Sequence, residues 1–577
     1  MAGINKKAAI IGGSVILLAA VVASVGVVVY RNTSSSVTPQ PAGNGDNLQT
    51  TSRSIQAICQ ATDYRDICVS SISKVANGTT DPSEIVKLSF QVAVDHLRQA
   101  VQSSKLLSAA AADPRTKDAL QTCRELIEYA VEDINTSFNK LGGFNLSDPE
   151  KAADELKLWL DSAATYQETC LDGFQNTTGD AAAGMRNALN ASMALTDNVL
   201  AIVGQLADVA SELKLPNYFR RRLLFNEEAK EIVFPSWVSA DRRKLLSVPP
   251  SGIRPDVVVA KDGSGDFSTI MAALGVAPTK SEKPFVIYVK TGVYKEKVTV
   301  FRNQTNIIMV GDGATSSKVT GSLNFIDGVV TFKTASFVVM GEGFIARDMG
   351  FENSAGPEKH QAVALLVQAD RSAFYRCQID GYQDTLYVHT LRQFYRDCTI
   401  SGTIDFIFGD AKAIFQNCLM LVRKPLSNQQ NIVTAQGRKS RMSATGIILL
   451  NCTVAADASF PASLHAVNPT YLGRPWKAYS RTFYIQSTLG ALIHPDGWLP
   501  WLGDFGLQTC FYSEVENTGP GADKSRRVKW RGVKNVDYPH AEKFTAEHFL
   551  WGNDWLPQTG VPYIPGLLPE LQPGRIH

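Results

Sequence analysis

Two aspartates and two glutamines in the C-terminal half of the chain could together carry out acid–base and nucleophilic chemistry. Asp384 and Asp405 are 21 residues apart, and Gln361 lies 23 residues before Asp384. Two neighbouring carboxyl groups do not ionise equally, because one is pushed toward the neutral acid while the other stays an anion. That division suits a general acid beside a nucleophile, and the amides of Gln361 and Gln383 could donate to a developing oxyanion.

The pattern around these residues predicts a right-handed parallel β-helix. Short β-branched and aromatic runs recur after Asp256, separated by Gly, Asn and Asp, with no long helical pattern between them. The segment 374–381 resembles 394–402, and weaker echoes follow at 415–419 and 450–454. A period near twenty residues fits one coil of a β-helix, in which each coil stacks on the last. An antiparallel sandwich is the alternative, but the repeated residues favour the β-helix.

This period places Asp384 and Asp405 on adjacent coils, because stacked strands lie ~4.8 Å apart. In a regular strand Gln383 and Asp384 would point to opposite faces, so one of them must lie at a turn or bulge. Both aspartates could instead be turn-capping residues of the β-helix with no catalytic role. Other chemistries have little support, since the chain lacks the Gly-x-Ser-x-Gly, Cys-x-x-Cys and His-Glu-x-x-His motifs.

The N-terminal half has a different periodicity, which predicts an all-α four-helix bundle over residues 53–212. Apolar residues recur at spacings of three and four in 84–104, 116–138 and 192–213. Asp81-Pro82 is typical of a helix start. Four cysteines fall in this part, of which Cys59 and Cys68 are close enough for a local bridge and Cys123 and Cys170 would join two helices.

The first residues predict an uncleaved membrane anchor. Positions 8–30 are uncharged and mostly apolar, long enough to cross a bilayer of ~30 Å, and Lys6 and Lys7 precede them. We therefore expect residues 1–31 to be a cytosolic tip and a transmembrane signal anchor, and 32–52 to be a linker.

A second linker is expected at 213–250. It contains the basic motifs 220–224 and 242–246, and exposed linkers are where proteolytic cleavage concentrates. A solvated basic patch is the alternative for either motif taken alone.

Composition excludes several classes of protein. The 577 residues are 44% hydrophobic and 19% charged, which rules out a collagen, a wholly disordered chain and a polytopic membrane protein. The net charge is only +2, so no nucleic acid is expected as a partner.

Five motifs identify the C-terminal part, residues 251–577, as similar to plant pectin methylesterases (pectinesterases, carbohydrate esterase family 8). They are Gly-Val-Tyr-Lys-Glu at 292–296, Gln-Ala-Val-Ala-Leu at 361–365, Gly-Tyr-Gln-Asp-Thr-Leu-Tyr at 381–387, Gly-Thr-Ile-Asp-Phe-Ile-Phe-Gly at 402–409 and Leu-Gly-Arg-Pro-Trp at 472–476. The helical part resembles the invertase/pectin methylesterase inhibitor family, with its four cysteines in the expected places.

The resemblance implies a role for each candidate residue. Asp405 would attack the methyl-ester carbonyl of a galacturonate unit, and Asp384 would protonate the departing methanol before acting as base on water. Gln383 and Gln361 would line the anion hole. Arg474 would pair with Asp405 and keep it ionised.

The resemblance also implies how substrate and structure are held. The substrate-binding residues would be Thr331, Gln361, Arg474 and Trp476, the last stacking on a sugar ring. Phe406, Tyr387 and Trp501 would shape the cleft, and Cys398 and Cys418 would form a disulfide between adjacent coils. No metal or organic cofactor is implied.

The expected function is hydrolysis of the methyl esters of homogalacturonan in cell wall modification. A subtilisin-like protease would cleave at the Arg221 or Arg243 motif, pectin methylesterase inhibitor proteins are possible partners, and the helical part could act as an intramolecular inhibitor or targeting region. The precursor would lie in the Golgi membrane and the product in the cell wall. A β-helical polysaccharide lyase, which would need carboxylates for calcium and a basic residue, and a non-catalytic pectin-binding or inhibitor protein are the alternatives.

Overall fold

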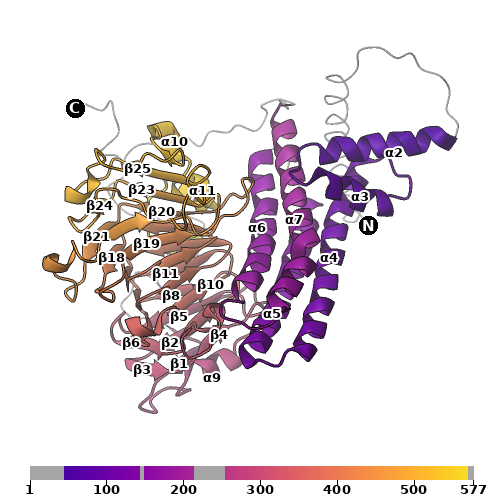
Figure 1. The fold of residues 1–577 in the computed structure, drawn as a ribbon. Coiled ribbons are helices and arrows are strands. Elements are labelled where there is room, and N and C mark those ends of the chain that lie inside the picture. The colour runs from indigo at the N-terminus through magenta and orange to yellow at the C-terminus, as the bar shows by residue number, and fades with distance from the viewer. Residues whose placement is uncertain (1–43, 143–147, 213–253, 569–577) are drawn as a thin grey trace, which may run out of the picture. The chain divides into compact units, whose positions relative to one another are not determined.

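The computed structural model describes residues 44–142, 148–212 and 254–568, which form two compact units (Figure 1). One unit is helical, and the other consists mainly of strands. The predicted anchor at 1–31 and the predicted processing linker at 213–250 lie outside these residues. Within the described ranges, no helix has the length and apolar character needed to cross a bilayer.

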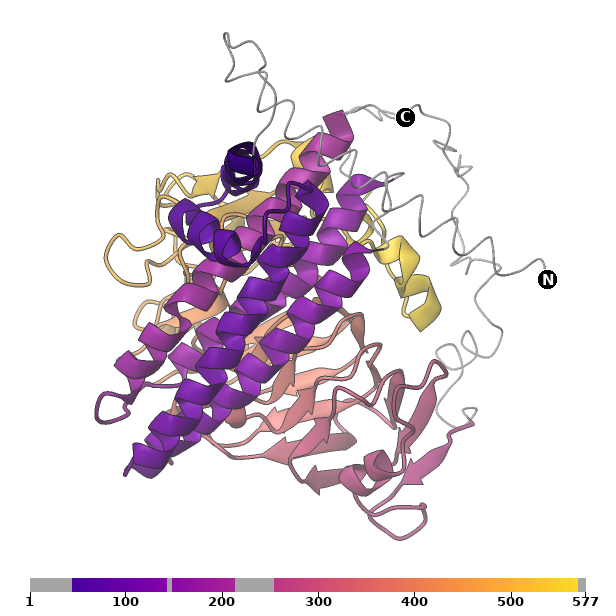
Figure 2. The ribbon, with the colours of Figure 1, turned by 90° about the vertical axis from the view of Figure 1, so that its right-hand side faces the viewer.

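The helical unit contains six helices among its described residues: α2 (Asn44–Cys59), α3 (Arg65–Val75), α4 (Pro82–Ala110), α5 (Pro114–Leu141), α6 (Pro149–Asp172) and α7 (Ala181–Glu212). The long helices run alongside one another (Figure 2), with α4 and α6 each packed on both α5 and α7. Asp81, Asp113 and Asp148 cap three of them, each followed by proline at the first helical position. Helix α2 begins at Asn44, inside the range 32–52 that the sequence predicts as a linker.

Both predicted disulfides of the helical unit are confirmed. Cys59–Cys68 links the end of α2 to α3, and Cys123–Cys170 links α5 to α6 with a Cα–Cα distance of 4.4 Å. All four cysteines are buried, so the two bridges lie within the core of this unit.

We expect the α5–α6 bridge to contribute more stability than the α2–α3 bridge. It closes a loop of 47 residues, for which loop entropy alone gives about 4 kcal/mol, whereas the nine-residue loop gives about 3 kcal/mol. Denaturant unfolding of the full chain, followed by far-ultraviolet circular dichroism, should therefore show a larger loss of unfolding free energy for the double variant Cys123→Ala/Cys170→Ala than for a variant that lacks the α2–α3 bridge. The matched control is Cys59→Ala with Cys68→Ala, and a larger loss in this control would contradict the expectation.

The strand-rich unit consists of parallel strands in three sheets, as a β-helix requires. The eleven-stranded sheet comprises β1 (Val257–Val259), β2 (Phe285–Val289), β5 (Ile307–Gly311), β8 (Ile345–Arg347), β11 (Ser372–Tyr375), β14 (Arg392–Arg396), β17 (Lys412–Gln416), β20 (Gly446–Leu450), β23 (Arg481–Ile485), β25 (Phe511–Val515) and β26 (Val533–Lys534). The eight-stranded sheet comprises β3 (Gly292–Lys295), β6 (Ser317–Gly321), β9 (Gly350–Asn353), β12 (Gln378–Asp380), β15 (Thr399–Gly402), β18 (Leu419–Val422), β21 (Thr453–Ala456) and β24 (Thr488–Leu489). The seven-stranded sheet comprises β4 (Val298–Val300), β7 (Phe337–Val339), β10 (Leu365–Val367), β13 (Leu386–Val388), β16 (Ile407–Gly409), β19 (Asn431–Gln436) and β22 (Thr470–Gly473).

Short helices accompany these sheets. Helix α9 (Ile270–Gly275) lies near the start of the unit, and α10 (Tyr538–Glu542), α11 (Ala546–Phe549) and α12 (Leu556–Thr559) follow the last strand. Single 3-10 turns occur at η2 (Thr331–Lys333), η3 (Pro357–Lys359), η4 (Ala462–Leu464), η5 (Pro520–Ala522) and η6 (Gly552–Asp554). Apolar side chains of the C-terminal helices cover the outer face of the eleven-stranded sheet, which closes a second hydrophobic core there.

The chain visits the three sheets in turn, so each circuit forms one coil. Strand β11 pairs with β14 and β14 with β17, and the corresponding strands of the other sheets pair in the same order. The predicted coil of about twenty residues is therefore confirmed for these circuits.

One detail of the predicted repeat is wrong. The sequence similarity aligned Phe374 with Phe394, but the structure pairs Phe374 with Tyr395. The Phe374 and Tyr395 rings stack 4.9 Å apart inside the β-helix. The turns after β11 and β14 both contain two residues, Arg376-Cys377 and Asp397-Cys398, so the cysteines are in register and the alignment of the two phenylalanines is one residue out.

Candidate active site

Asp384 and Asp405 occupy equivalent positions on adjacent coils. Each lies two residues before a strand of the seven-stranded sheet, and the first residues of those strands, Leu386 and Ile407, are direct partners in the ladder. Both aspartates lie in turns with left-handed backbone, with φ of 59° and 50°. Asp is among the few residues that adopt this conformation readily. The turn explains how Gln383 and Asp384 can both serve one site.

Arg474 binds Asp405 through two hydrogen bonds. It follows β22, and its Nε and Nη2 donate to the two carboxylate oxygens of Asp405 at 2.8 and 2.6 Å. Such a paired contact fixes both the charge and the orientation of a carboxylate. The Arg474 guanidinium also lies over the Trp501 ring, 4.3 Å from its centre. These two hydrogen bonds fix the orientation of the Asp405 carboxyl group.

The Asp384 carboxyl is in the opposite electrostatic situation. Its side chain is buried, with only 8% of the residue exposed. Burial raises its pKa well above the usual value, the charge of Asp405 raises it further, and Arg474 acts in the opposite direction. Among the described residues, no hydrogen bond to either Asp384 carboxyl oxygen compensates for burial of the charged form. The two aspartates therefore lie in different surroundings: Asp405 is paired with Arg474, and Asp384 is buried with a raised pKa.

Backbone hydrogen bonds place the two glutamines on neighbouring coils. The carbonyl oxygen of Gln383 accepts from the amide of Ala362 at 3.2 Å, which brings the Gln361 segment beside the Gln383 segment. The amide of Asp384 donates to Ile404 at 3.0 Å, which links this turn to the one that carries Asp405. The side-chain oxygen of Gln361 is buried and has no hydrogen-bond partner in the described part of the chain.

Aromatic side chains pack on the outer face of the seven-stranded sheet. The Tyr387 and Phe408 rings stack with centres 4.1 Å apart, and Trp476 meets Phe408 edge-on at 5.8 Å. Trp501 and Phe332 pack against the same cluster. Thr331 begins the turn η2, directly before Phe332. These contacts bring Trp476, Tyr387 and Trp501 together beside Arg474.

Phe406 does not belong to this face, so its predicted place in the cleft is wrong. It is fully buried in the interior core of the β-helix, while Phe408 packs under Tyr387. Sequence reasoning missed Phe408. The alternation of side chains along a strand could have found it, because Ile407 and Phe408 must face opposite sides of β16.

His389 is a second buried residue beside this cluster that sequence reasoning missed. Its ring lies 4.6 Å from Tyr387, and its Nδ1 is 3.0 Å from the side-chain oxygen of Gln368. Burial lowers the pKa of His389 to about 3, so the imidazole is neutral over the range in which enzymes work. It packs behind the aromatic cluster as an uncharged ring.

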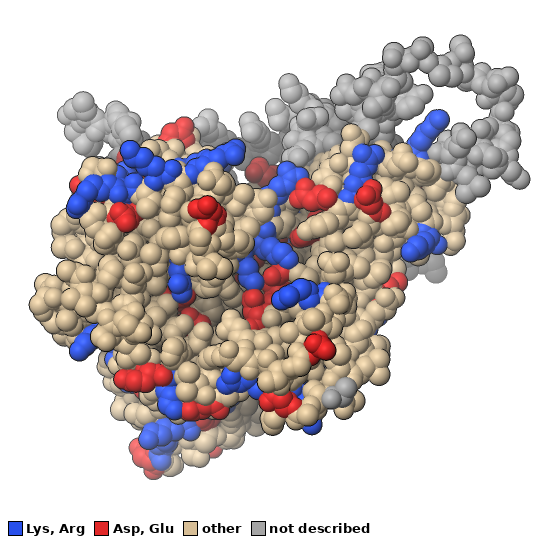
Figure 3. Space-filling view, viewed as in Figure 1, with Lys and Arg blue, Asp and Glu red and all other residues tan. Residues whose placement is uncertain are grey.

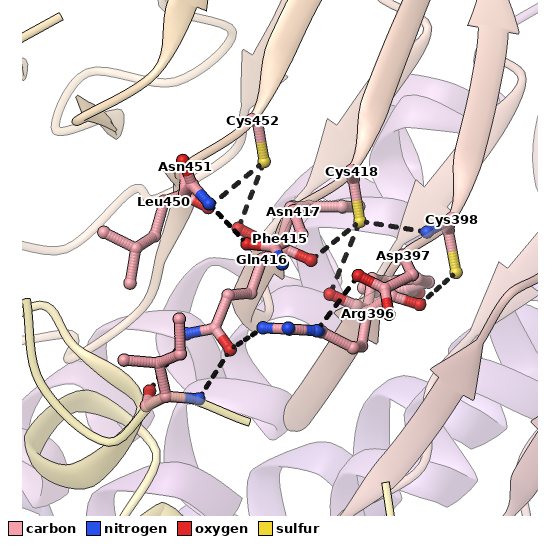
Figure 4. A network of polar contacts seen from close by, with 12 residues as sticks. Arg396, Asp397, Cys398, Phe415, Gln416, Asn417, Cys418, Leu450, Asn451 and Cys452 are labelled. Atoms are coloured by element: carbon pink, nitrogen blue, oxygen red, sulfur yellow. Dashed lines mark hydrogen bonds and ion pairs between the residues drawn. The ribbon is translucent and has the colours of Figure 1, made fainter. Parts of the chain in front are cut away.

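The predicted disulfide between Cys398 and Cys418 is absent, and both residues are thiols. The two cysteines lie on successive coils, and the amide of Cys398 donates to Cys418 Sγ at 3.4 Å (Figure 4). Cys452 continues the column on the next coil, and its Sγ donates to the Phe415 carbonyl. Each sulfur contacts the backbone of the preceding coil, and neighbouring thiols in the column also interact with one another. The cysteines therefore form a buried ladder.

Charges of both signs are interspersed on the face of the molecule in Figure 3. Recognition of an acidic polymer on that face would depend on local contacts, since no broad region of one sign creates a long-range field there.

The described residues include no group of three His, Cys, Asp or Glu arranged to hold a metal ion.

Comparison with known families assigns both units. The family model described as Pectinesterase matches residues 256–553, which include the whole candidate site. The model described as Plant invertase/pectin methylesterase inhibitor matches residues 53–202.

Relatives of known sequence cover nearly the whole chain. Pectinesterase/pectinesterase inhibitor 28 of Arabidopsis thaliana is 44% identical over 564 residues, which are 98% of this chain and 75% of the relative. Pectinesterase 3 of Phaseolus vulgaris is 42% identical over 93% of this chain and 91% of its own length. Among solved structures, the pectin methylesterase from carrot is 48% identical with a TM-score of 0.54, covering 55% of this chain and 99% of the carrot protein.

Proposed function

Because the chain belongs to the pectinesterase family, we propose that Asp405, Asp384, Gln361, Gln383 and Arg474 carry out the hydrolysis of pectin methyl esters in this protein. The enzyme class is carboxylic ester hydrolase, and an inhibitor-like region precedes the catalytic unit. The observation that supports these residue roles is the paired contact of Arg474 with Asp405 beside the buried Asp384.

In the first step, a carboxylate oxygen of Asp405 attacks the ester carbonyl carbon of a galacturonate unit. The carbonyl oxygen becomes an oxyanion, which the side-chain amides of Gln361 and Gln383 stabilise by donating hydrogen bonds. Asp384 then gives its proton to the methoxy oxygen, the carbon–oxygen bond breaks, and methanol leaves. The raised pKa of Asp384 keeps that proton available.

In the second step, water hydrolyses the acyl-enzyme. Asp384, now ionised, takes a proton from the water as it attacks the acyl carbon, and the Asp405 carboxylate is released together with the free acid of the polymer. Arg474 stabilises the Asp405 anion at the start and at the end of the cycle. Trp476 and Thr331 hold the sugar chain, with the ring of Trp476 stacked on an apolar sugar face.

The remaining parts of the proposal concern processing. The helical unit is an inhibitor-like four-helix bundle that restrains or targets the enzyme, and the membrane anchor at 1–31 holds the precursor in the Golgi membrane. A subtilisin-like protease cuts at the Arg221 or Arg243 motif, after which the catalytic unit, with boundaries at 251–577, is secreted to the cell wall. Separate pectin methylesterase inhibitor proteins are further partners. The similarity of residues 53–202 to the inhibitor family supports the role of the helical unit.

The activity is tested by expressing the full chain in a eukaryotic secretory host and assaying the purified product on highly methylated pectin. We expect methanol without unsaturated uronide, because the site contains a carboxylate pair and amide donors. An Asp405→Asn preparation from the same host serves as the blank for contaminating esterases. Unsaturated product would indicate a lyase, and a folded sample that releases neither product would contradict catalysis.

A further inference from the structure

A guanidinium from the coil after Asp405 stacks on a tyrosine ring of the coil that carries Asp384. Arg423, directly after β18, lies over the ring of Tyr382, with its central carbon 4.1 Å from the ring centre. Its Nη1 also donates to the carbonyl oxygen of Gly381 at 2.9 Å. Both contacts fall just before Gln383 and Asp384 in the chain.

Arg423 reaches these partners across the coil that bears Asp405. The amide of Thr403 donates to the Tyr382 carbonyl at 2.9 Å, and the amide of Arg423 donates to the Gly402 carbonyl at 2.8 Å. Tyr382, Thr403 and Arg423 therefore begin three consecutive turns at the same corner of the β-helix. Thr403 lies between the other two and is only 1% exposed.

We propose that Arg423 and Tyr382 form a clip that sets the spacing between the Asp384 turn and the Asp405 turn, so that Arg423 is a positioning residue for the reaction. The clip joins the first and third of these turns over the second. Arg423 lies on the coil that leads into β19, and Arg474 follows β22 on the next coil, so both arginines come from the same side of the Asp405 turn in the ladder. The inference rests on the proposed catalytic roles of the two aspartates.

The physical reason is that catalysis depends on the distance between these carboxyl groups. Both aspartates lie in left-handed turns, and contacts to those turns set where their carboxyl groups lie. A planar guanidinium that stacks on a ring and donates to a carbonyl restrains a turn in two directions. A displacement of about 1 Å at a reacting group can lower the rate about 100-fold.

Arg423→Gln should therefore lower kcat roughly 10- to 100-fold while KM for methylated pectin stays within about twofold. The alkaline limb of the rate profile should also move to lower pH. Asp384 faces Asp405 and Arg474, and the Asp405 charge raises the Asp384 pKa only while the two carboxyl groups are held close. A role in stability alone would leave this limb in place.

Arg376→Gln is the matched control. Arg376 lies over the Tyr375 ring at 4.9 Å and binds Asp348, but at the corner between β11 and β12, away from the catalytic turns. This variant should keep the kcat and the alkaline limb of the parent enzyme.

Two tyrosine variants keep the test valid if Arg423→Gln does not fold. Tyr382→Phe retains the ring and should retain activity, whereas Tyr382→Ala should reproduce the fall in kcat and the shifted limb. In the Tyr382→Ala background, Arg423→Gln should have little further effect, because partners in one contact are not additive.

Three results for Arg423→Gln would overturn the clip. The first is a kcat and an alkaline limb of the pH–rate profile equal to those of Arg376→Gln. The second is a rise in KM with unchanged kcat, which would make Arg423 a substrate contact, and the third is an effect on kcat that adds fully to that of Tyr382→Ala. Failure of the parent enzyme to release methanol would overturn the proposed function together with the clip.

Discussion

Asp405→Asn is expected to abolish methanol release, with kcat lowered on the order of 10⁴-fold or more. An asparagine amide cannot form the acyl-enzyme, and its neutral side chain leaves the guanidinium of Arg474 without the two charge-assisted hydrogen bonds it now makes at 2.8 and 2.6 Å. The measurement is methanol release from highly methylated pectin under single-turnover and steady-state conditions.

Asp397→Asn is the control for this variant. Asp397 also lies in a left-handed turn, with φ of 52°, and it belongs to the same coil as Asp405. Its carboxylate contacts the neighbouring Arg396 instead of Arg474. We expect this control to keep activity close to that of the parent, and retained activity in Asp405→Asn would exclude Asp405 as the nucleophile.

Asp384→Asn is expected to lower kcat by roughly 10²- to 10⁴-fold, the range that general acid–base groups supply. Asparagine cannot protonate the departing methanol or accept a proton from water. In the parent enzyme, the rate should fall on the alkaline side as Asp384 loses its proton, and the residual rate of the variant should lack this dependence. An unchanged alkaline limb in Asp384→Asn would assign the limb to another group.

The same variant should be more stable than the parent enzyme near neutral pH. The folded-state pKa of Asp384 is raised above the usual 3.8, so the folded protein binds this proton more tightly than the unfolded chain does. Stability is therefore lost as pH rises from 3.8 through the folded-state pKa, and the full cost is present above it.

Asp384→Asn removes that cost. We expect its Tm to exceed that of the parent at neutral pH, with the difference shrinking as pH falls toward 3.8. Thermal unfolding of both proteins across this pH range measures it, and a lower Tm for the variant at neutral pH would contradict the electrostatic assignment.

The sequence by itself determined which residues could react and on which coils they lie. The 21-residue separation of Asp384 and Asp405 predicted adjacent rungs because the coil length is fixed by the period of the strands, and Leu386 and Ile407 are paired accordingly. The start of helix α4 was also predictable from local sequence, because Asp81 caps the helix and Pro82 supplies the φ that its first residue requires.

Only the tertiary structure decided how those residues point and which of them meet. Whether Phe406 or Phe408 lies on the outer face depends on which alternate side chains around β16 point outward. Whether Cys398 and Cys418 form a disulfide depends on how their side chains are placed on successive coils. The contact of Arg423 with Tyr382 spans three turns separated by some forty residues of chain, and the raised pKa of Asp384 comes from burial by the assembled coils. Local patterns carry no information about such directions and burial, because these arise only when distant segments pack together.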